Sequence, residues 1–191
     1  MTKGRMEAFS DGVIAILITI MVLELKVPHG TAWASLRPML PEMLSYLLSF
    51  VFVGIYWNNH HHLLHTASKV SGGILWANLH LLFWLSLIPL ATAWMGENHT
   101  EAAPCSAYGV VMTGAAIAYY ILQEAIVAHH GPDSKLRAAL GSDLKAKFSL
   151  ASYAGAIGLA YASTWIAIGI YILVAGIWLV PDKRLESVID H

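Results

Sequence analysis

The fold follows from one stretch near the start of the chain, Arg5-Met-Glu-Ala-Phe9-Ser10-Asp11-Gly12-Val-Ile-Ala-Ile16-Leu-Ile-Thr19-Ile20-Met-Val-Leu23-Glu24. About 20 largely apolar residues are enough for a helix to cross a bilayer. An arginine and an aspartate at the head of such a helix are costly, and charged groups there usually pair, line a water path or take part in function. We therefore predict a membrane-spanning helix with a functional role.

The rest of the chain predicts the same class of protein. Of its 191 residues, 57% are hydrophobic and 12% are charged, against roughly 25% charged residues in soluble domains. The predicted spans are residues 7–25, 42–63, 73–95, 105–128, 147–163 and 165–180. We expect an all-α, polytopic membrane protein with six transmembrane helices in a single domain, residues 1–191. The lone Cys105 excludes an intrachain disulfide, and a net charge of −1 leaves no basic surface for nucleic acid.

The positive charges predict the orientation of these spans. With six spans and a cytoplasmic N-terminus, nine of the 11 lysines and arginines fall on the cytoplasmic side. These nine are Lys3, Arg5, Lys69, Lys135, Arg137, Lys145, Lys147, Lys183 and Arg184. Only Lys26 and Arg37 fall outside. Because cytoplasmic loops are enriched in lysine and arginine, both termini are expected to be cytoplasmic.

One face of the first helix is a candidate pore wall. At about 100° per residue, one apolar stripe contains Phe9, Gly12, Ile16, Thr19, Ile20 and Leu23. A ring of identical helices from several subunits would turn this stripe into a narrow constriction that resists wetting. Thr19 would add a ring of hydroxyls, and Glu24 near the outer end would favour cations at the mouth.

Ordinary helix packing also explains an apolar stripe with a single threonine. The Thr19 hydroxyl can bond back to the carbonyl of Ala15 within its own helix. Ser10 or Asp11 can serve as the N-cap of a helix that starts later, although Met6 to Phe9 already look helical and apolar. The stripe alone leaves these alternatives open.

The head of this helix resembles the signature of the potassium channels of the transmembrane protein 175 family. The resemblance rests on Arg5-x-x-x-Phe9-Ser10-Asp11 and the Ile-Thr-Ile-Met-Val-Leu-Glu-Leu continuation. It rests further on Trp57-Asn-Asn-His60-His61-His62 and on Ala77-Asn78-Leu79 with Ser86-Leu-Ile-Pro89. It covers the first three predicted helices well and the last three mainly by length and topology.

The resemblance implies a homotetramer in which the first helix lines a central pore. It implies a passive, leak-type potassium conductance, in which K⁺ permeates and no catalysis or cofactor is involved. By position, Ile16, Ile20 and Leu23 correspond to the apolar constriction and Thr19 to the hydroxyl layer credited with selectivity. The expected partners are other copies of the chain, membrane lipid and K⁺. A single six-helix unit resembles the prokaryotic form, which implies the plasma (inner) membrane of a prokaryote.

The family also pairs the arginine and aspartate of the signature with polar residues of neighbouring helices. Asp11 points away from the stripe, so we expect it to meet His60, His61 or Asn78, with Arg5 joining from the same layer. Together with Phe9 and Ser10, these residues would form a structural or gating network. If the histidines lie near Asp11, acidification of the cytoplasm is expected to alter this network.

The histidines also suggest an alternative class, a membrane metalloprotein that carries a metal or acts as an enzyme. His61 and His65 are four residues apart on one helical face, a spacing that suits zinc or iron. His62, His80, His129 and His130 are further candidate ligands. However, no carboxylate accompanies the cluster at helical spacing, and histidines at a helix end more often form hydrogen bonds or reach toward the interface.

Overall fold

The computed structural model describes residues 2–67, 69–130 and 144–179, and every element assigned in them is helical. The elements are α1 (Lys3–Leu23), η1 (Trp33–Met39), α2 (Leu40–Thr66), α3 (Gly72–Ser86), α4 (Ile88–Glu97), α5 (Ala102–His130), α7 (Leu144–Leu159) and α8 (Thr164–Leu179). The predicted all-α class is thus confirmed for the described residues. Lys135, Arg137, Lys183 and Arg184, which entered the orientation argument, lie outside them.

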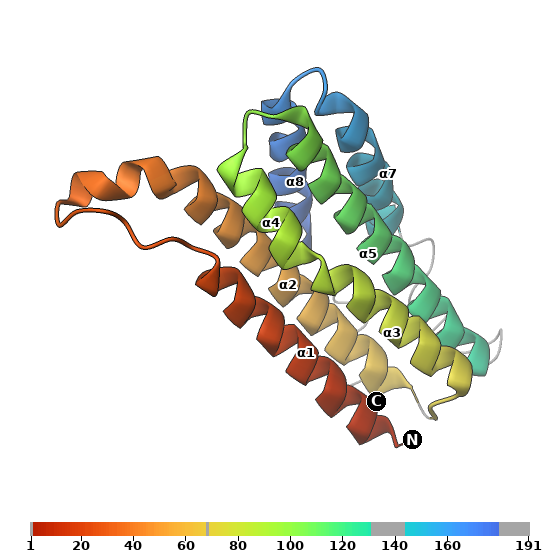
Figure 1. The fold of residues 1–191 in the computed structure, drawn as a ribbon. Helices are drawn as coiled ribbons and strands as arrows, with labels where there is room; N and C mark the ends of the chain where they lie inside the picture. The colour runs from red at the N-terminus through yellow and green to blue at the C-terminus, as the bar shows by residue number, and fades with distance from the viewer. Residues whose placement is uncertain (1, 68, 131–143, 180–191) are drawn as a thin grey trace.

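The helices form an elongated bundle with α1 along one side (Figure 1). α1 packs against α2, α3 and α4, whereas α5 packs against α3, α4, α7 and α8. The first helix is therefore peripheral within its own subunit, and α5 is central. We refer below to the Lys3 end and the Leu23 end of the bundle, after the two ends of α1.

The third predicted span is broken in two. α3 ends at Ser86, Leu87 forms the junction, and Pro89 lies in the first turn of α4. Proline removes a backbone donor and clashes with the preceding turn, so an uninterrupted helix is disfavoured at this point. Pro89 therefore accounts for the break between α3 and α4.

Four of the predicted spans correspond to helices that are long and apolar enough to cross a membrane: Lys3–Leu23, Trp33–Thr66, Gly72–Glu97 and Ala102–Ala128. The last two predicted spans correspond to α7 and α8, each of 16 residues. At 1.5 Å per residue these are about 24 Å long, less than the hydrocarbon core of about 30 Å. Helix length therefore supports membrane crossing by four segments and leaves six spans unconfirmed.

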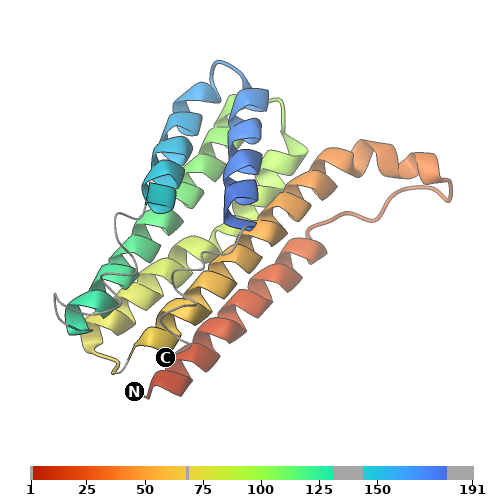
Figure 2. The same ribbon diagram turned by 180° about the vertical axis from the view of Figure 1, so that it is seen from behind.

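A projecting arm distinguishes the Leu23 end. η1 and the first turns of α2 extend beyond the ends of the other helices, and Trp33 on this arm is almost fully exposed (Figures 1 and 2). α2 then runs back along α1 and α4 to the Lys3 end. This long helix places the histidine run at the Lys3 end, beside the start of α1.

Candidate functional site: the two faces of the first helix

The first helix has two faces with opposite environments. Its buried face consists of Met6, Ser10, Ile14, Leu17 and Met21, at the three- and four-residue spacing of one helical stripe. The candidate pore residues lie on the other side and are all exposed: Phe9, Gly12, Ile16, Thr19, Ile20 and Leu23. The predicted stripe is therefore the face of α1 that its own subunit does not cover.

The stripe is apolar except for one hydroxyl. Ile16 is 57% exposed and Leu23 is 81% exposed. The Thr19 hydroxyl donates a hydrogen bond of 2.8 Å to the carbonyl of Ile16, not to that of Ala15 as the packing alternative expected. Since a hydroxyl has one proton and two lone pairs, this bond uses the proton and leaves acceptor capacity on the oxygen.

Three buried polar side chains link α1 to α2 and α3. Asn78 Nδ2 donates to Ser10 Oγ at 2.9 Å, and His60 Nε2 lies 2.7 Å from Asn78 Oδ1. Ser10 Oγ in turn donates to the carbonyl of Met6 at 2.9 Å. All three side chains are at most 2% exposed. Buried polar groups are stable only when they are hydrogen-bonded, so these contacts connect the three helices.

The hydrogen bonds of this cluster run in one direction. The Ser10 hydroxyl proton goes to the carbonyl of Met6, so its oxygen accepts from the Asn78 amide. The Asn78 carbonyl oxygen is then left as an acceptor, and His60 must donate from Nε2. Each member therefore requires the orientation of the next, which fixes the rotation of α1 about its axis.

The prediction that Asp11 contacts His60, His61 or Asn78 is wrong. Its carboxylate accepts a hydrogen bond of 3.1 Å from Trp57 Nε1, and it is the adjacent Ser10 that meets Asn78 and His60. Ser10 lies on the buried face of α1, whereas Asp11 is rotated by about 100° to the exposed rim beside α2. His61 is exposed, and its ring lies 6.4 Å from that of Trp57.

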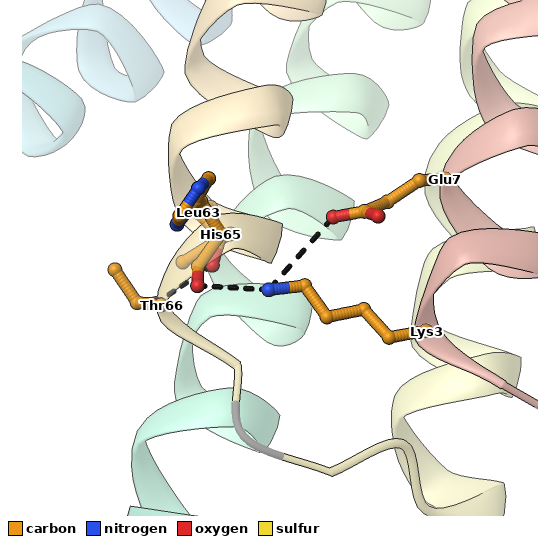
Figure 3. A network of polar contacts seen from close by, with 5 residues as sticks. All are labelled: Lys3, Glu7, Leu63, His65 and Thr66. Atoms are coloured by element: carbon orange, nitrogen blue, oxygen red, sulfur yellow. Dashed lines mark hydrogen bonds and ion pairs between the residues drawn. The ribbon is translucent and has the colours of Figure 1, made fainter. Parts of the chain in front are cut away.

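Arg5 does not join the polar cluster. It is exposed, and within the described part of the chain it makes no hydrogen bond or ion pair. The same end of α1 is instead held by Lys3, which the sequence had suggested only as a topological charge. Lys3 Nζ donates to the His65 carbonyl at 2.9 Å and lies 3.9 Å from a Glu7 oxygen (Figure 3). A cation at the last carbonyls of α2 is favoured by the helix dipole.

The Leu23 end of α1 is held by an ion pair beyond the helix. Lys26 donates to Glu97 at the end of α4, and the hydrogen bond and charge of Glu97 raise the pKa of Lys26. Glu24, the expected cation-attracting group, is exposed at the C-terminus of α1. α1 is thus tied down by polar contacts at its two ends and by apolar packing between them.

The described residues do not favour the metalloprotein alternative. They contain no group of three or more His, Cys, Asp or Glu side chains arranged to hold a metal. The ring of His61 lies 5.7 Å from that of His62 and 6.2 Å from that of His65. His80 accepts a hydrogen bond from Trp84 on its own helix. The side chains of His129 and His130 lie outside the described part.

Sequence reasoning missed two members of this site, Trp57 and Lys3. Trp57 lies at the start of the quoted Trp-Asn-Asn-His run but was not among the expected partners of Asp11. Because Trp57 and His61 are four residues apart on α2, they share a face; an indole donor beside the Asp11 carboxylate was therefore a possible signal. For Lys3 the sequence holds no comparable signal, because its acceptor is a backbone carbonyl.

The fold and site define a class: a helical membrane protein whose first helix buries a polar-linked face and exposes an apolar one. Comparison with known proteins narrows this class. Residues 5–89 match the family model described as the endosomal/lysosomal potassium channel TMEM175. A protein of Chryseobacterium sp. (strain P1-3), described as a potassium channel, is 58% identical over 98% of this chain and 97% of its own length. The chain belongs to the TMEM175 family of channels.

Two further relatives extend the match along the whole chain. A potassium channel of Streptomyces collinus is 32% identical over 97% of both chains. The crystal structure of a lysosomal potassium-selective channel TMEM175 homologue from Chamaesiphon minutus superposes with a TM-score of 0.81 at 27% identity. That match covers 95% of this chain and 98% of the other. The fold is therefore shared beyond the matched residues 5–89.

Proposed function

We propose that this protein is a potassium channel that assembles as a homotetramer around a central pore lined by α1. This proposal is supported by two relatives of similar length, both of which are described as potassium channels. Permeation is passive and needs no cofactor. The subunit has six spans, with the shorter α7 and α8 as the last two, and both termini face the cytoplasm. The bacterial sources of these relatives favour the plasma membrane of a prokaryote as its location.

The observation that carries this proposal is the exposed stripe of α1. The polar cluster of Ser10, Asn78 and His60 holds the opposite face against the subunit. An apolar face left uncovered in this way contacts lipid, another subunit or a dry pore. In a ring of four copies the stripe faces the axis, and the isoleucines and leucine form a constriction that resists wetting.

Thr19 supplies the selectivity of this constriction. Its proton is committed to the Ile16 carbonyl, so its oxygen faces a passing ion as an acceptor. Four such oxygens, one per subunit, form a layer that can replace part of the ion's hydration shell. Ile16, Ile20 and Leu23 set the width of the path, and Glu24 concentrates cations near its mouth.

The buried cluster and the rim contact of Asp11 with Trp57 act as the frame of the pore helix. Neither contact faces the stripe, so neither meets the ion. Their role is to fix the rotation of α1, because a rotation of one residue, about 100°, would exchange the pore face for the rim. Phe9 belongs to the exposed face beside this frame and closes the Lys3 end of the stripe.

Ion flux into liposomes tests this proposal. Purified protein is reconstituted with internal potassium, and potassium and sodium fluxes are compared, with valinomycin marking the maximal potassium signal. We expect a potassium-preferring flux that rises when Ile16→Asn wets the constriction. Thr19→Ala should reduce the preference for potassium over sodium while flux remains.

Val22→Asn is the matched control. Val22 is an exposed apolar residue of the same helix but lies about 100° away from Leu23 on the rim. A polar group at this position should leave flux unchanged. If Val22→Asn raises flux as much as Ile16→Asn does, the stripe is not the pore; if the unaltered protein carries no flux, the channel proposal fails.

A further inference from the structure

A deep apolar groove lies away from the pore helix, between α2 and α8. Its volume is about 600 Å³. Figure 2 shows the helices that form its two walls, α8 in dark blue and the first half of α2 in orange. The α2 wall runs from Leu40 to Val51 and the α8 wall from Trp165 to Leu179. At 1.5 Å per residue the α2 wall is about 16 Å long.

Missing side chains create this groove. Gly169 and Gly176 belong to the α8 wall, and a Cβ added at either position would meet no atom within 4 Å. The facing residues Leu44 and Ile172 remain more than half exposed. An unfilled apolar space forfeits dispersion contacts on all of its walls, so an apolar occupant is favoured.

The groove has one polar end. His99, in the turn after α4, lines it at the Leu23 end, where its ring meets that of Trp165 edge-on at 6.1 Å between centroids. The Nδ1 atom of His99 is buried and has no hydrogen-bond partner among the described residues. Tryptophan favours the membrane–water boundary, so this end is at the depth where lipid chains join their headgroups.

We propose that the groove binds one acyl chain of a phospholipid, with the ester and phosphate end of the lipid beside His99. The lining favours a chain over a protein segment. A helix is about 10–12 Å across with its side chains, and its ends carry unsatisfied backbone groups for which an almost wholly apolar lining offers few partners. An extended hydrocarbon chain is narrower and matches a lining that is almost wholly apolar.

Native mass spectrometry of the assembled protein tests this site independently of ion conduction. The protein is stripped of lipid in detergent and titrated with dioleoyl phosphatidylglycerol, and the lipid-bound fraction is measured. We expect Gly176→Leu and Gly169→Leu, which fill the groove, each to weaken binding about tenfold, because a leucine displaces roughly two methylenes of the chain. His99→Leu should weaken it about fivefold through one lost hydrogen bond.

Gly155→Leu is the matched control. Gly155 lies on α7, outside the groove, is exposed, and also has no atom within 4 Å of an added Cβ. This variant should bind lipid like the parent. Equal binding by Gly155→Leu and the two groove variants would overturn the proposal. So would dissociation of the oligomer in both groove variants, which would identify the groove as a contact between copies of the chain.

Discussion

In the half of α1 toward Leu23, the buried face and the exposed face are both largely apolar, yet they have different roles. Ile14, Leu17 and Met21 pack inside the subunit, whereas Ile16, Ile20 and Leu23 are left outside it. In a membrane, hydrophobicity does not distinguish a packed face from an exposed one, because lipid is as apolar as leucine. The distinction comes from Ser10, whose buried hydroxyl has partners on only one side of the helix.

The difference between the two faces of α1 is tested most directly at two adjacent residues, Leu17 and Ile16. Leu17 is 4% exposed, so Leu17→Ala should lower the free energy of unfolding by about 2–5 kcal/mol through the cavity it leaves. Ile16→Ala should change it by less than about 1 kcal/mol but raise ion flux. Thermal unfolding followed by tryptophan fluorescence, together with flux, checks both. Equal destabilisation by the two variants would contradict the two-face description.

The polar link of the buried face is tested at Asn78. Asn78→Leu leaves the buried His60 without its acceptor, which should cost about 1–3 kcal/mol. Asn98→Leu is the control, because among the described residues the Asn98 side-chain amide bonds to a carbonyl of its own helix. Thermal unfolding should separate the two variants. If Asn78→Leu melts like Asn98→Leu, the cluster does not hold α1.

Loss of the hydrogen bond between Trp57 and Asp11 on the rim should lower the free energy of unfolding by less than loss of the buried cluster does. Trp57→Phe keeps an aromatic ring but removes the donor to Asp11, and the loss of one exposed hydrogen bond is worth about 1 kcal/mol or less. Asp11→Asn keeps an acceptor and should change stability less than Trp57→Phe. Measured stabilities in the reverse order would show that the charge of Asp11, and not this hydrogen bond, matters.

The ion pair at the Leu23 end should have the smallest effect. Lys26 and Glu97 are both exposed, and such pairs are screened by solvent and salt. Because the pKa of Lys26 is raised from an already high value, Lys26 stays charged through neutral pH, and its contribution is lost as the pH rises to strongly alkaline values. Lys26→Met should leave the melting temperature almost unchanged at 0.5 M salt. A large loss there would mean that the pair is part of the fold.

Sequence patterns predicted the elements of this site better than its contacts. The helical period placed Ile16, Thr19, Ile20 and Leu23 on one face, and the structure leaves that face exposed. The same period placed Asp11 away from the stripe but did not show which neighbouring helix lies at that angle. Trp57, and not a histidine, occupies that position, since it depends on how α2 packs against α1.

The limits of prediction at the end of the chain have a different cause. Hydropathy treats α7 and α8 as spans like the others, although each has 16 residues in the described part of the chain. The groove between α2 and α8 was also not foreseen. Its lining combines Leu44 and Leu48 of α2 with Gly169 and Gly176 of α8. These segments are more than 100 positions apart in the sequence, and no local pattern encodes their proximity.

The most direct test of the central claim is a cysteine scan of α1 in a Cys105→Ser background, with flux measured before and after a charged, water-soluble thiol reagent. Cys105 lies on α5 and not on the stripe of α1, so this background should conduct like the parent. We expect modification to block flux at positions 16, 19, 20 and 23, and to leave it unchanged at position 22 on the rim. Block at position 22 with none along the stripe would contradict the account.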